Sequence, residues 1–201
     1  MSTETPTTGR PRAFDEDTVL GRAAEVFWRH GYEGASMTAL TAAMGINRPS
    51  LYSTFGSKQE LFRRAFARYH ENQVAVARAA LDQPTARVAI EAFLRSSADG
   101  LTDVDHPPGC LSIQGGLACS PENAGIAEIL AAGRAATEAA LQERLSRAAA
   151  EGDLPAGMDP RALARFVMAL SEGHAVHAAT GARREDLQAS VDIALRTVAM
   201  P

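Results

Sequence analysis

Apolar residues recur three and four positions apart along most of the chain, which is the spacing of one helical face. The clearest stripe lies within residues 15–30 and consists of Val19, Leu20, Ala23, Ala24, Val26 and Phe27. Acidic residues at 15–17 favour a helix start there through the helix dipole. No stretch of the sequence reads as a strand, so the pattern predicts an all-α fold with about nine helices.

Most of the predicted helices follow residue 57 and are separated by segments rich in proline or glycine. They cover residues 57–81, 85–101, 110–119, 121–151, 159–180 and 184–200. Helix 85–101 is predicted to bury Val88 with Phe93, and helix 159–180 to place Phe166 on the same face as Leu163. The helical prediction for 110–119 is weakened by its two adjacent glycines.

Residues 36–66 show a more specific arrangement of two short helices and the start of a long one. Ser36 is a plausible N-cap for a helix that ends near Met44, and Gly45 supplies a turn. Asn47 can cap a second helix, in which Pro49 falls in the tolerated first turn. The long helix opens with a predicted capping box, S-x-x-E, over residues 57–60.

The second short helix has two different faces. Leu51 and Phe55 are four residues apart and share an apolar face, whereas Arg48 and Tyr52 share a polar one. Two short helices joined by a glycine turn, the second with an exposed polar face, are typical of a helix-turn-helix.

This region resembles the DNA-binding domain of the TetR/AcrR family of bacterial transcription regulators. The resemblance is carried by AAEVFWRHGYEGASMTAL (residues 23–40) and TAAMGINRPSLYSTFGSKQELF (residues 41–62). It covers about a quarter of the chain and implies a three-helix helix-turn-helix domain followed by a helical domain for ligand binding and dimerisation. We therefore expect a flexible arm at 1–12, a DNA-binding domain at 13–60 and the second domain at 61–201.

Charge supports this division of the chain. The net charge is −4 overall, but residues 1–70 hold nine basic and seven acidic residues, whereas the rest hold eleven and seventeen. Because local charge decides phosphate attraction, the basic excess lies where DNA binding is predicted. Arg10 and Arg12 end the N-terminal arm, which either is a solvated tail or lies on phosphates or in a minor groove.

Eight residues are candidates for contacts with DNA. Arg48 can donate two hydrogen bonds to guanine or bind a phosphate, and the resemblance gives Tyr52 a phosphate contact. Lys58 begins a helix, where free backbone amides already favour an anion, so it is a candidate phosphate clamp. The alternative is a helical bundle in which these side chains are merely solvated. The full set is Thr38, Thr41, Arg48, Pro49, Ser50, Tyr52, Ser53 and Lys58.

The C-terminal part offers weaker candidates for a ligand or sensor site, namely Cys110, Gln114, Cys119, Met168 and His174. Two cysteines are too few for a disulfide framework, and each is either inert core or, with a lowered pKa and access, a reactive thiol. His174 and His177 are spaced as metal ligands can be, but no third ligand is evident. No cofactor or metal is predicted.

The sequence therefore predicts a DNA-binding regulator rather than an enzyme, because it contains none of the common catalytic motifs. The resemblance implies a repressor that binds a palindromic double-stranded operator as a homodimer through its last two helices and is released by a small-molecule effector. Those helices could instead face their own subunit's core. Alternatives are a thiol-based redox or electrophile sensor using Cys110 and a helical protein-interaction module. No secretory signal or membrane-length apolar run is found, so we expect a cytoplasmic protein that does not contact membranes.

Overall fold

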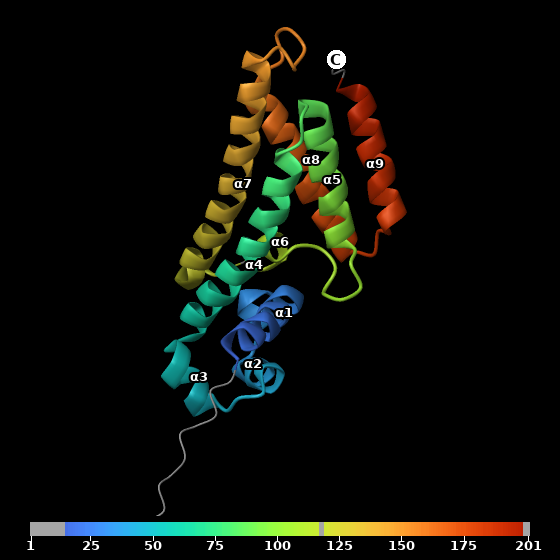
Figure 1. Ribbon diagram of the computed structural model, residues 1–201. Coiled ribbons are helices and arrows are strands. Elements are labelled where there is room, and N and C mark those ends of the chain that lie inside the picture. The colour runs from blue at the N-terminus through green and yellow to red at the C-terminus, as the bar shows by residue number, and fades with distance from the viewer. Residues whose placement is uncertain (1–14, 117–118, 199–201) are drawn as a thin grey trace, which may run out of the picture.

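The computed structural model describes residues 15–116 and 119–198, and every regular element in these ranges is helical (Figure 1). The predicted arm at 1–12 lies outside them. The elements are α1 (Glu16–Gly34), α2 (Met37–Met44), α3 (Arg48–Phe55), α4 (Lys58–Leu81), α5 (Ala86–Leu101), α6 (Leu111–Gln114), the 3-10 helix η1 (Pro121–Asn123), α7 (Ala124–Ala150), α8 (Pro160–Ala179) and α9 (Arg184–Thr197). The all-α prediction is confirmed. No helix in the described ranges is long and apolar enough to cross a membrane.

The helices form two groups that share α4. Helices α1 and α3 pack on the first half of α4 at one end of the molecule, and α2 packs on α1 and α3 (Figure 1). Helices α5 and α7 pack on the second half of α4, α8 packs on α5 and α7, and α9 packs on α5. The predicted domain boundary at residue 60 falls within the first turn of α4. One continuous helix, α4, therefore belongs to both groups and joins them.

The group made by α1, α2, α3 and the first half of α4 has an aromatic core. The rings of Phe27 and Phe62 meet edge to face with centroids 4.9 Å apart, and neither side chain is exposed. Such pairs stabilise a core beyond the area they bury. Leu111, Ile126 and Leu130 of the C-terminal part complete the same cluster. The helix-turn-helix region is therefore packed against the rest of the molecule.

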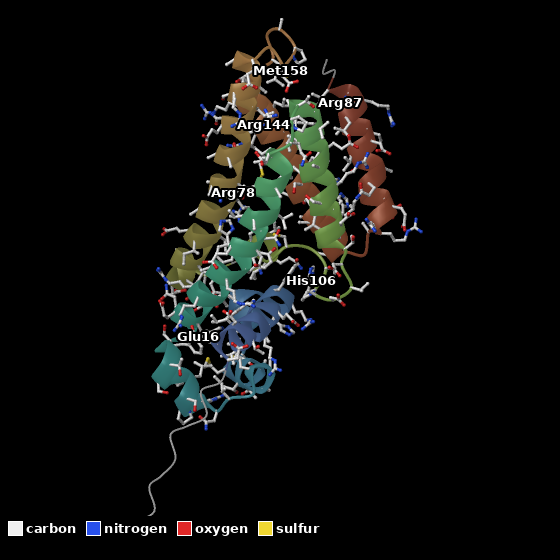
Figure 2. All side chains as sticks on the ribbon, viewed as in Figure 1. Glu16, Arg78, Arg87, His106, Arg144 and Met158 are labelled. Atoms are coloured by element: carbon white, nitrogen blue, oxygen red, sulfur yellow. The ribbon has the colours of Figure 1, made fainter. Side chains whose placement is uncertain are left out.

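In the second group, made by α5, α7, α8, α9 and the second half of α4, a buried arginine links α7 to the end of α4. Arg144 of α7 donates from Nε to the carbonyl of Leu81 and from Nη2 to that of Gln83, at 3.1 and 3.0 Å (Figure 2). Leu81 is the last residue of α4 and Gln83 follows its C-cap, so the guanidinium lies at the C-terminal end of the helix, where the helix dipole favours a cation. Arg144 thus fixes the upper end of α4 against α7.

Several local predictions hold and others need correction. Helical geometry breaks at Gly31, where the first helix is predicted to end, but one further turn continues to Gly34. Half of the capping box at 57–60 forms, because the Ser57 hydroxyl accepts from the Glu60 amide. The Glu60 carboxylate makes an ion pair with Arg63 rather than the expected contact with the Ser57 amide. The prediction that Val88 is buried is wrong.

Val88 and Phe166 are exposed because the buried stripes pass beside them. The buried stripe of α5 contains residues 86, 89, 90, 93, 94, 98 and 101, so Val88 lies on the opposite side. On α8 the buried residues include Leu163 and Val167, which leaves Phe166 facing outward. In both helices the three- and four-residue spacing permits more than one face, and tertiary packing selects it.

Candidate functional site

The helix-turn-helix is built by two capping residues and one glycine. The Ser36 hydroxyl accepts from the Ala39 amide at 3.1 Å, and the Asn47 side chain accepts from the Ser50 amide at 2.8 Å. Gly45 ends α2 with a φ of 68°, a left-handed conformation that favours glycine. The three predicted roles are confirmed, and they set the angle between α2 and α3.

Helix α3 is anchored by one face and presents the other to solvent. Leu51 and Phe55 are buried in the aromatic core. Tyr52 is 49% exposed although it is a large aromatic residue. The other exposed side chains of this face are Arg48, Pro49 and Ser53, with Ser50 half-buried. A rigid helix with an exposed polar and aromatic face has the shape and chemistry that reading a DNA groove requires.

The structure brings Arg48 of α3 against α2, where its Nη2 donates to the Thr38 hydroxyl at 3.0 Å. Thr41 and Ser53 donate their hydroxyl protons to backbone carbonyls of their own helices, at 2.9 and 3.0 Å. Each hydroxyl must rotate away from its carbonyl before it can donate to a phosphate. Because Arg48 contacts Thr38, the predicted DNA-contact residues of α2 and α3 form one continuous polar surface.

Lys58 lies at the start of α4, and its ammonium contacts an aromatic ring of α1. Its Nζ is 4.6 Å from the centroid of the Tyr32 ring, a cation–π contact with α1. Burial lowers the pKa of Lys58, and the nearby Glu33 carboxylate opposes that shift. The ammonium is thus held at the junction of α1 and α4 by an aromatic face.

A cavity of about 280 Å³ lies between the two groups of helices. Its walls come from α1, α4, α5, α6, α7, α8 and the loop that precedes α6. The aromatic and apolar lining includes Trp28, Tyr69, Val76, Ala77, Phe93, Leu101, Ile113, Met168 and Ala175. A mostly apolar cavity with a few polar groups is the usual form of a small-molecule site.

Cys110 stands in the cavity wall with two hydroxyl neighbours. Its Sγ is 3.2 Å from the Tyr69 hydroxyl and 2.9 Å from that of Ser112. Burial raises the pKa of Tyr69 well above its usual range, so this phenol remains protonated. His106, in the loop that precedes α6, stacks on Trp28 of α1 with centroids 5.0 Å apart, and both residues line the cavity.

The charged groups of the cavity wall are Arg134 of α7 and Glu172 of α8. The Arg134 Nε lies 3.7 Å from Glu172 Oε1, and its Nη1 donates to the Ser112 carbonyl of α6. His70 also lines the cavity, and burial lowers its pKa, which favours the neutral imidazole. One guanidinium and one carboxylate therefore supply the wall's permanent charges.

The five predicted ligand or sensor residues fall into three places. Cys110 and Met168 line the cavity. Gln114 and Cys119 lie beside a second cleft next to residues 29–33, and burial raises the pKa of the Cys119 thiol. His174 is buried between α8 and α9, where its Nε2 meets the Ser190 hydroxyl.

Gln114 links the cavity wall to the helix-turn-helix region. Its Oε1 accepts from the Trp28 indole at 3.0 Å and from the Cys110 amide at 2.8 Å. Next to it, the Gly115 carbonyl accepts from the Tyr32 amide at 2.9 Å. The break of α1 at Gly31 leaves that amide available. Helix α1 is thus tied to α6 by one side-chain and one backbone hydrogen bond.

Sequence reasoning missed the cavity residues Trp28, Tyr69, Arg134 and Glu172 as a group. One signal was present on α4, where the apolar stripe through Phe62 and Phe66 continues into His70 and Gln73 at the same spacing. An apolar stripe that continues into polar residues indicates a helix face that other helices cover but that lines a space open to polar groups. Within the described ranges, no group of three or more His, Cys, Asp or Glu side chains could hold a metal ion.

Comparison with known families identifies the chain. Residues 19–65 match the family described as "Bacterial regulatory proteins, tetR family", and residues 84–194 match "Tetracyclin repressor-like, C-terminal domain". The chain belongs to the TetR family. The resemblance carried by residues 23–62 is thereby confirmed, and it extends over the C-terminal helices.

Relatives within the TetR family are similar over nearly the whole chain. The repressor ComR of Escherichia coli is 34% identical over 190 residues, which cover 94% of this chain and 90% of ComR. YezE of Bacillus subtilis, a transcriptional regulator, is 32% identical over 189 residues, which cover 93% of this chain and 97% of YezE. The solved structure of a cysteine mutant of the TetR family regulator CifR, in complex with a 26-base-pair operator DNA, is 43% identical with a TM-score of 0.90. That match covers 94% of this chain and all of the CifR chain.

Membership of the TetR family establishes the broad activity. The protein is a DNA-binding transcriptional regulator with an N-terminal helix-turn-helix. Its relatives are named as regulators, several of them repressors, and not as enzymes. The polar face of α3, built and exposed as described above, is the part of the fold that suits this activity.

Proposed function

We propose that the protein is a repressor that binds a palindromic operator as a homodimer and leaves it when a small molecule fills the cavity. The observation that carries the proposal is that Trp28 of α1 shares the cavity wall with residues of α5, α7 and α8. A molecule bound there touches both groups of helices. Release requires only that the ligand bind the released conformation more tightly than the DNA-bound one.

For the DNA contacts we propose the surface formed by α2, α3 and the start of α4. Arg48 is the candidate for base readout, and Tyr52 and Lys58 are candidates for phosphate contacts. The supporting residues are Thr38, Thr41, Pro49, Ser50 and Ser53. We assign residues 13–60 to DNA binding and residues 61–201 to ligand binding and dimerisation.

For the dimer contact we propose the outer faces of α8 and α9. Phe166 and Val176 of α8 are 44% and 50% exposed, and Ile193 of α9 is 58% exposed. The intervening α8 positions on this face are small residues, Ala169 and Gly173. Two such helices from each subunit would bury these side chains in a four-helix bundle and set two reading helices about 34 Å apart, or a multiple of that.

Fluorescence anisotropy tests this proposal on labelled duplexes from upstream of the protein's own gene and its neighbours. We expect tight binding to one palindromic segment, with a dissociation constant that rises steeply with salt because several phosphates are contacted. A scrambled duplex of equal length is the control. Equal affinity for both duplexes would contradict sequence-specific repression, and small molecules that fill the cavity without changing affinity would contradict effector release.

Thiol sensing through Cys110 is the second candidate function, supported by the place of its Sγ in the cavity wall. A thiolate at this position would displace iodide from iodoacetamide and leave a bulky thioether inside the cavity. We expect alkylation to weaken operator binding in the wild type and in Cys119→Ser but not in Cys110→Ser. The Cys119 control is apt because burial raises that thiol's pKa and slows its reaction. Equal weakening in all three proteins would exclude Cys110 as the sensor.

A further inference from the structure

We infer that the effector carries a carboxylate that binds Arg134, and that this contact draws Arg134 away from α6 and so loosens the helix-turn-helix region. The inference rests on the proposed function, because it takes the cavity to be the effector site. Its starting point is that Arg134 joins the cavity to α6 through the Ser112 carbonyl. Four observations support it: the guanidinium's free donors, the weak hold on Glu172, the apolar remainder of the cavity, and the chain of hydrogen bonds from Ser112 to α1.

Arg134 has donors to spare on the cavity side. A guanidinium has five N–H groups, and the hydrogen bond to the Ser112 carbonyl uses one of them. The 3.7 Å separation between its Nε and Glu172 Oε1 is longer than a hydrogen bond. A planar carboxylate can take two parallel hydrogen bonds from such a group, which is a stronger arrangement than the present ion pair.

Glu172 is the more easily displaced member of the pair. Its side chain is 39% exposed, against 23% for Arg134, and within the described part of the chain its carboxylate accepts no hydrogen bond. It can therefore turn toward solvent when a second carboxylate arrives, whereas Arg134 is tethered to α6. This asymmetry favours an anionic ligand over a cationic one that would pair with Glu172.

The rest of the cavity suits the body of a small carboxylic acid. Phe93 and Met168 provide apolar surface, and Trp28 and Tyr69 provide aromatic surface at the end nearest α1. One fixed cation beside this apolar and aromatic surface, with neutral hydroxyls such as Ser97, Thr137 and Ser171 elsewhere in the wall, matches a monocarboxylate with an alkyl or aryl body. Polyanions would leave further charges buried without partners.

A short chain of hydrogen bonds connects Arg134 to the DNA-binding end. Arg134 holds the Ser112 carbonyl, and two residues later Gln114 accepts from the Trp28 indole of α1. A carboxylate that takes two parallel hydrogen bonds from the free N–H groups turns the planar guanidinium toward the cavity, and this rotation pulls Nη1 away from the Ser112 carbonyl. Because α6 is only four residues long, releasing one of its carbonyls shifts the whole helix and weakens its hold on α1.

Hexanoate and phenylacetate are suitable probes, with hexanamide and phenylacetamide as neutral matches and hexylamine as the cationic match. Thermal unfolding reports binding, and anisotropy on the operator duplex reports release. We expect the carboxylates to raise the melting temperature and to weaken operator binding about tenfold at saturation. The amides should require at least about ten times higher concentrations, because they lack the charge that strengthens hydrogen bonds to arginine.

Two variants make the result specific to this pair. Arg134→Gln should abolish the difference between carboxylate and amide, whereas Glu172→Gln should tighten carboxylate binding several-fold by removing its competitor. Amides that act as well as carboxylates would overturn the carboxylate inference and leave the proposed function intact, as would a response to hexylamine that Glu172→Gln removes. A complete lack of binding by the carboxylates would also overturn the inference.

Failure of the proposed function has a different signature. Ala77→Phe adds a ring to the α4 wall of the cavity and leaves the residues Arg134 and Ser112 unsubstituted. If the cavity controls DNA binding, the operator affinity of this variant should fall even without any probe. Two results together would reject the cavity as the effector site and the relay with it: carboxylates that bind the wild type through Arg134 without changing its operator affinity, and an Ala77→Phe variant whose operator affinity without probe equals that of the wild type.

Discussion

The indole of Trp28 and the amide of Gln114 are hydrogen bonded across 86 positions of sequence, with Nε1 and Oε1 3.0 Å apart. Trp28 belongs to the helix that supports the helix-turn-helix, and Gln114 ends the short helix that walls the cavity. The same Oε1 also accepts from the Cys110 amide. One side-chain oxygen therefore connects α6 both to α1 and to the loop residue Cys110 in the cavity wall.

Replacing Gln114 by Leu should destabilise the protein, because two N–H donors lose their acceptor at once. We expect the free energy of unfolding in urea to fall by about 2 kcal/mol. The same change at Gln142, which is exposed on α7, should alter it by less than about 0.5 kcal/mol. An equal loss at both positions would show that the Trp28–Gln114 bond does not stabilise the fold.

Gly133 of α7 lies directly against Phe66 of α4. A Cβ at this position would lie 3.0 Å from Cζ of Phe66, whose ring is stacked between Phe62 and His70. Gly133→Ala should therefore lower the free energy of unfolding by about 1 kcal/mol, despite alanine's better helix propensity. Gly100→Ala on α5 meets no atom within 4 Å and should raise it by up to about 1 kcal/mol. The opposite signs are the test, and stabilisation by both changes would mean that Phe66 moves freely.

The elements were predictable from sequence where their causes are local. Ser36 and Asn47 cap their helices through atoms three residues away, so a short window of sequence contains the whole interaction. Gly45 likewise ends α2 through its own φ angle. These local signals are enough to locate α3 and its exposed face without any tertiary contact.

The cavity was not predictable because its residues meet only through packing. Arg134 and Glu172 stand 38 positions apart on separate helices, and each resembles an ordinary surface charge in sequence. Phe166 shows the same limit, since its spacing fits a buried stripe as well as an outward one. Periodicity names candidate faces, and the neighbouring helices decide which of them is covered.

The DNA-contact surface predicts different salt behaviour for two of its residues. Lys58→Gln removes a charge and should lower the slope of log affinity against log salt by about one. Tyr52→Phe removes a neutral hydroxyl and should weaken binding about fivefold on every operator sequence without changing the slope. Arg147→Gln, at an exposed position in the last turn of α7, loses the same charge as Lys58→Gln and should leave the slope unchanged.

The melting temperature of Lys58→Gln should be measured in parallel, because the wild-type ammonium also packs on Tyr32. A slope that is unchanged in a well-folded Lys58→Gln protein would remove Lys58 from the interface. A slope that falls in Arg147→Gln as well would mean that overall charge, rather than a specific contact, sets the salt dependence.

The outward faces of α8 and α9 predict the oligomeric state. Phe166→Asp would place two carboxylates in the proposed dimer contact, where they are desolvated without partners. Light scattering after size exclusion should then give a monomer, and operator binding should weaken strongly. Val88→Asp introduces the same charge at an exposed apolar position of α5 and should remain dimeric. A monomeric wild type, or a dimer that survives Phe166→Asp, would reject this contact.

His174 predicts a loss of stability in mild acid. The Ser190 hydroxyl donates to the Leu187 carbonyl, so Ser190 accepts from His174 Nε2, and the buried Nδ1 is left without a partner. Burial, and then the charge of His177, lower the pKa of His174 below its ordinary 6.5. The unfolded state therefore binds a proton more readily than the folded state, and the stabilisation is present above pH 6.5 and lost as the pH falls below it.

His174→Gln provides the matched variant, because its amide can still donate to Ser190 but does not titrate. Urea unfolding between pH 7.5 and 5.5 should show a steeper decline for the wild type than for the variant. Part of the decline should remain in His174→Gln, since burial also lowers the pKa of His70 with the same sign. Parallel curves for the two proteins would mean that His174 accepts its proton in the folded state without cost, so that the α8–α9 contact can accommodate a charged imidazole.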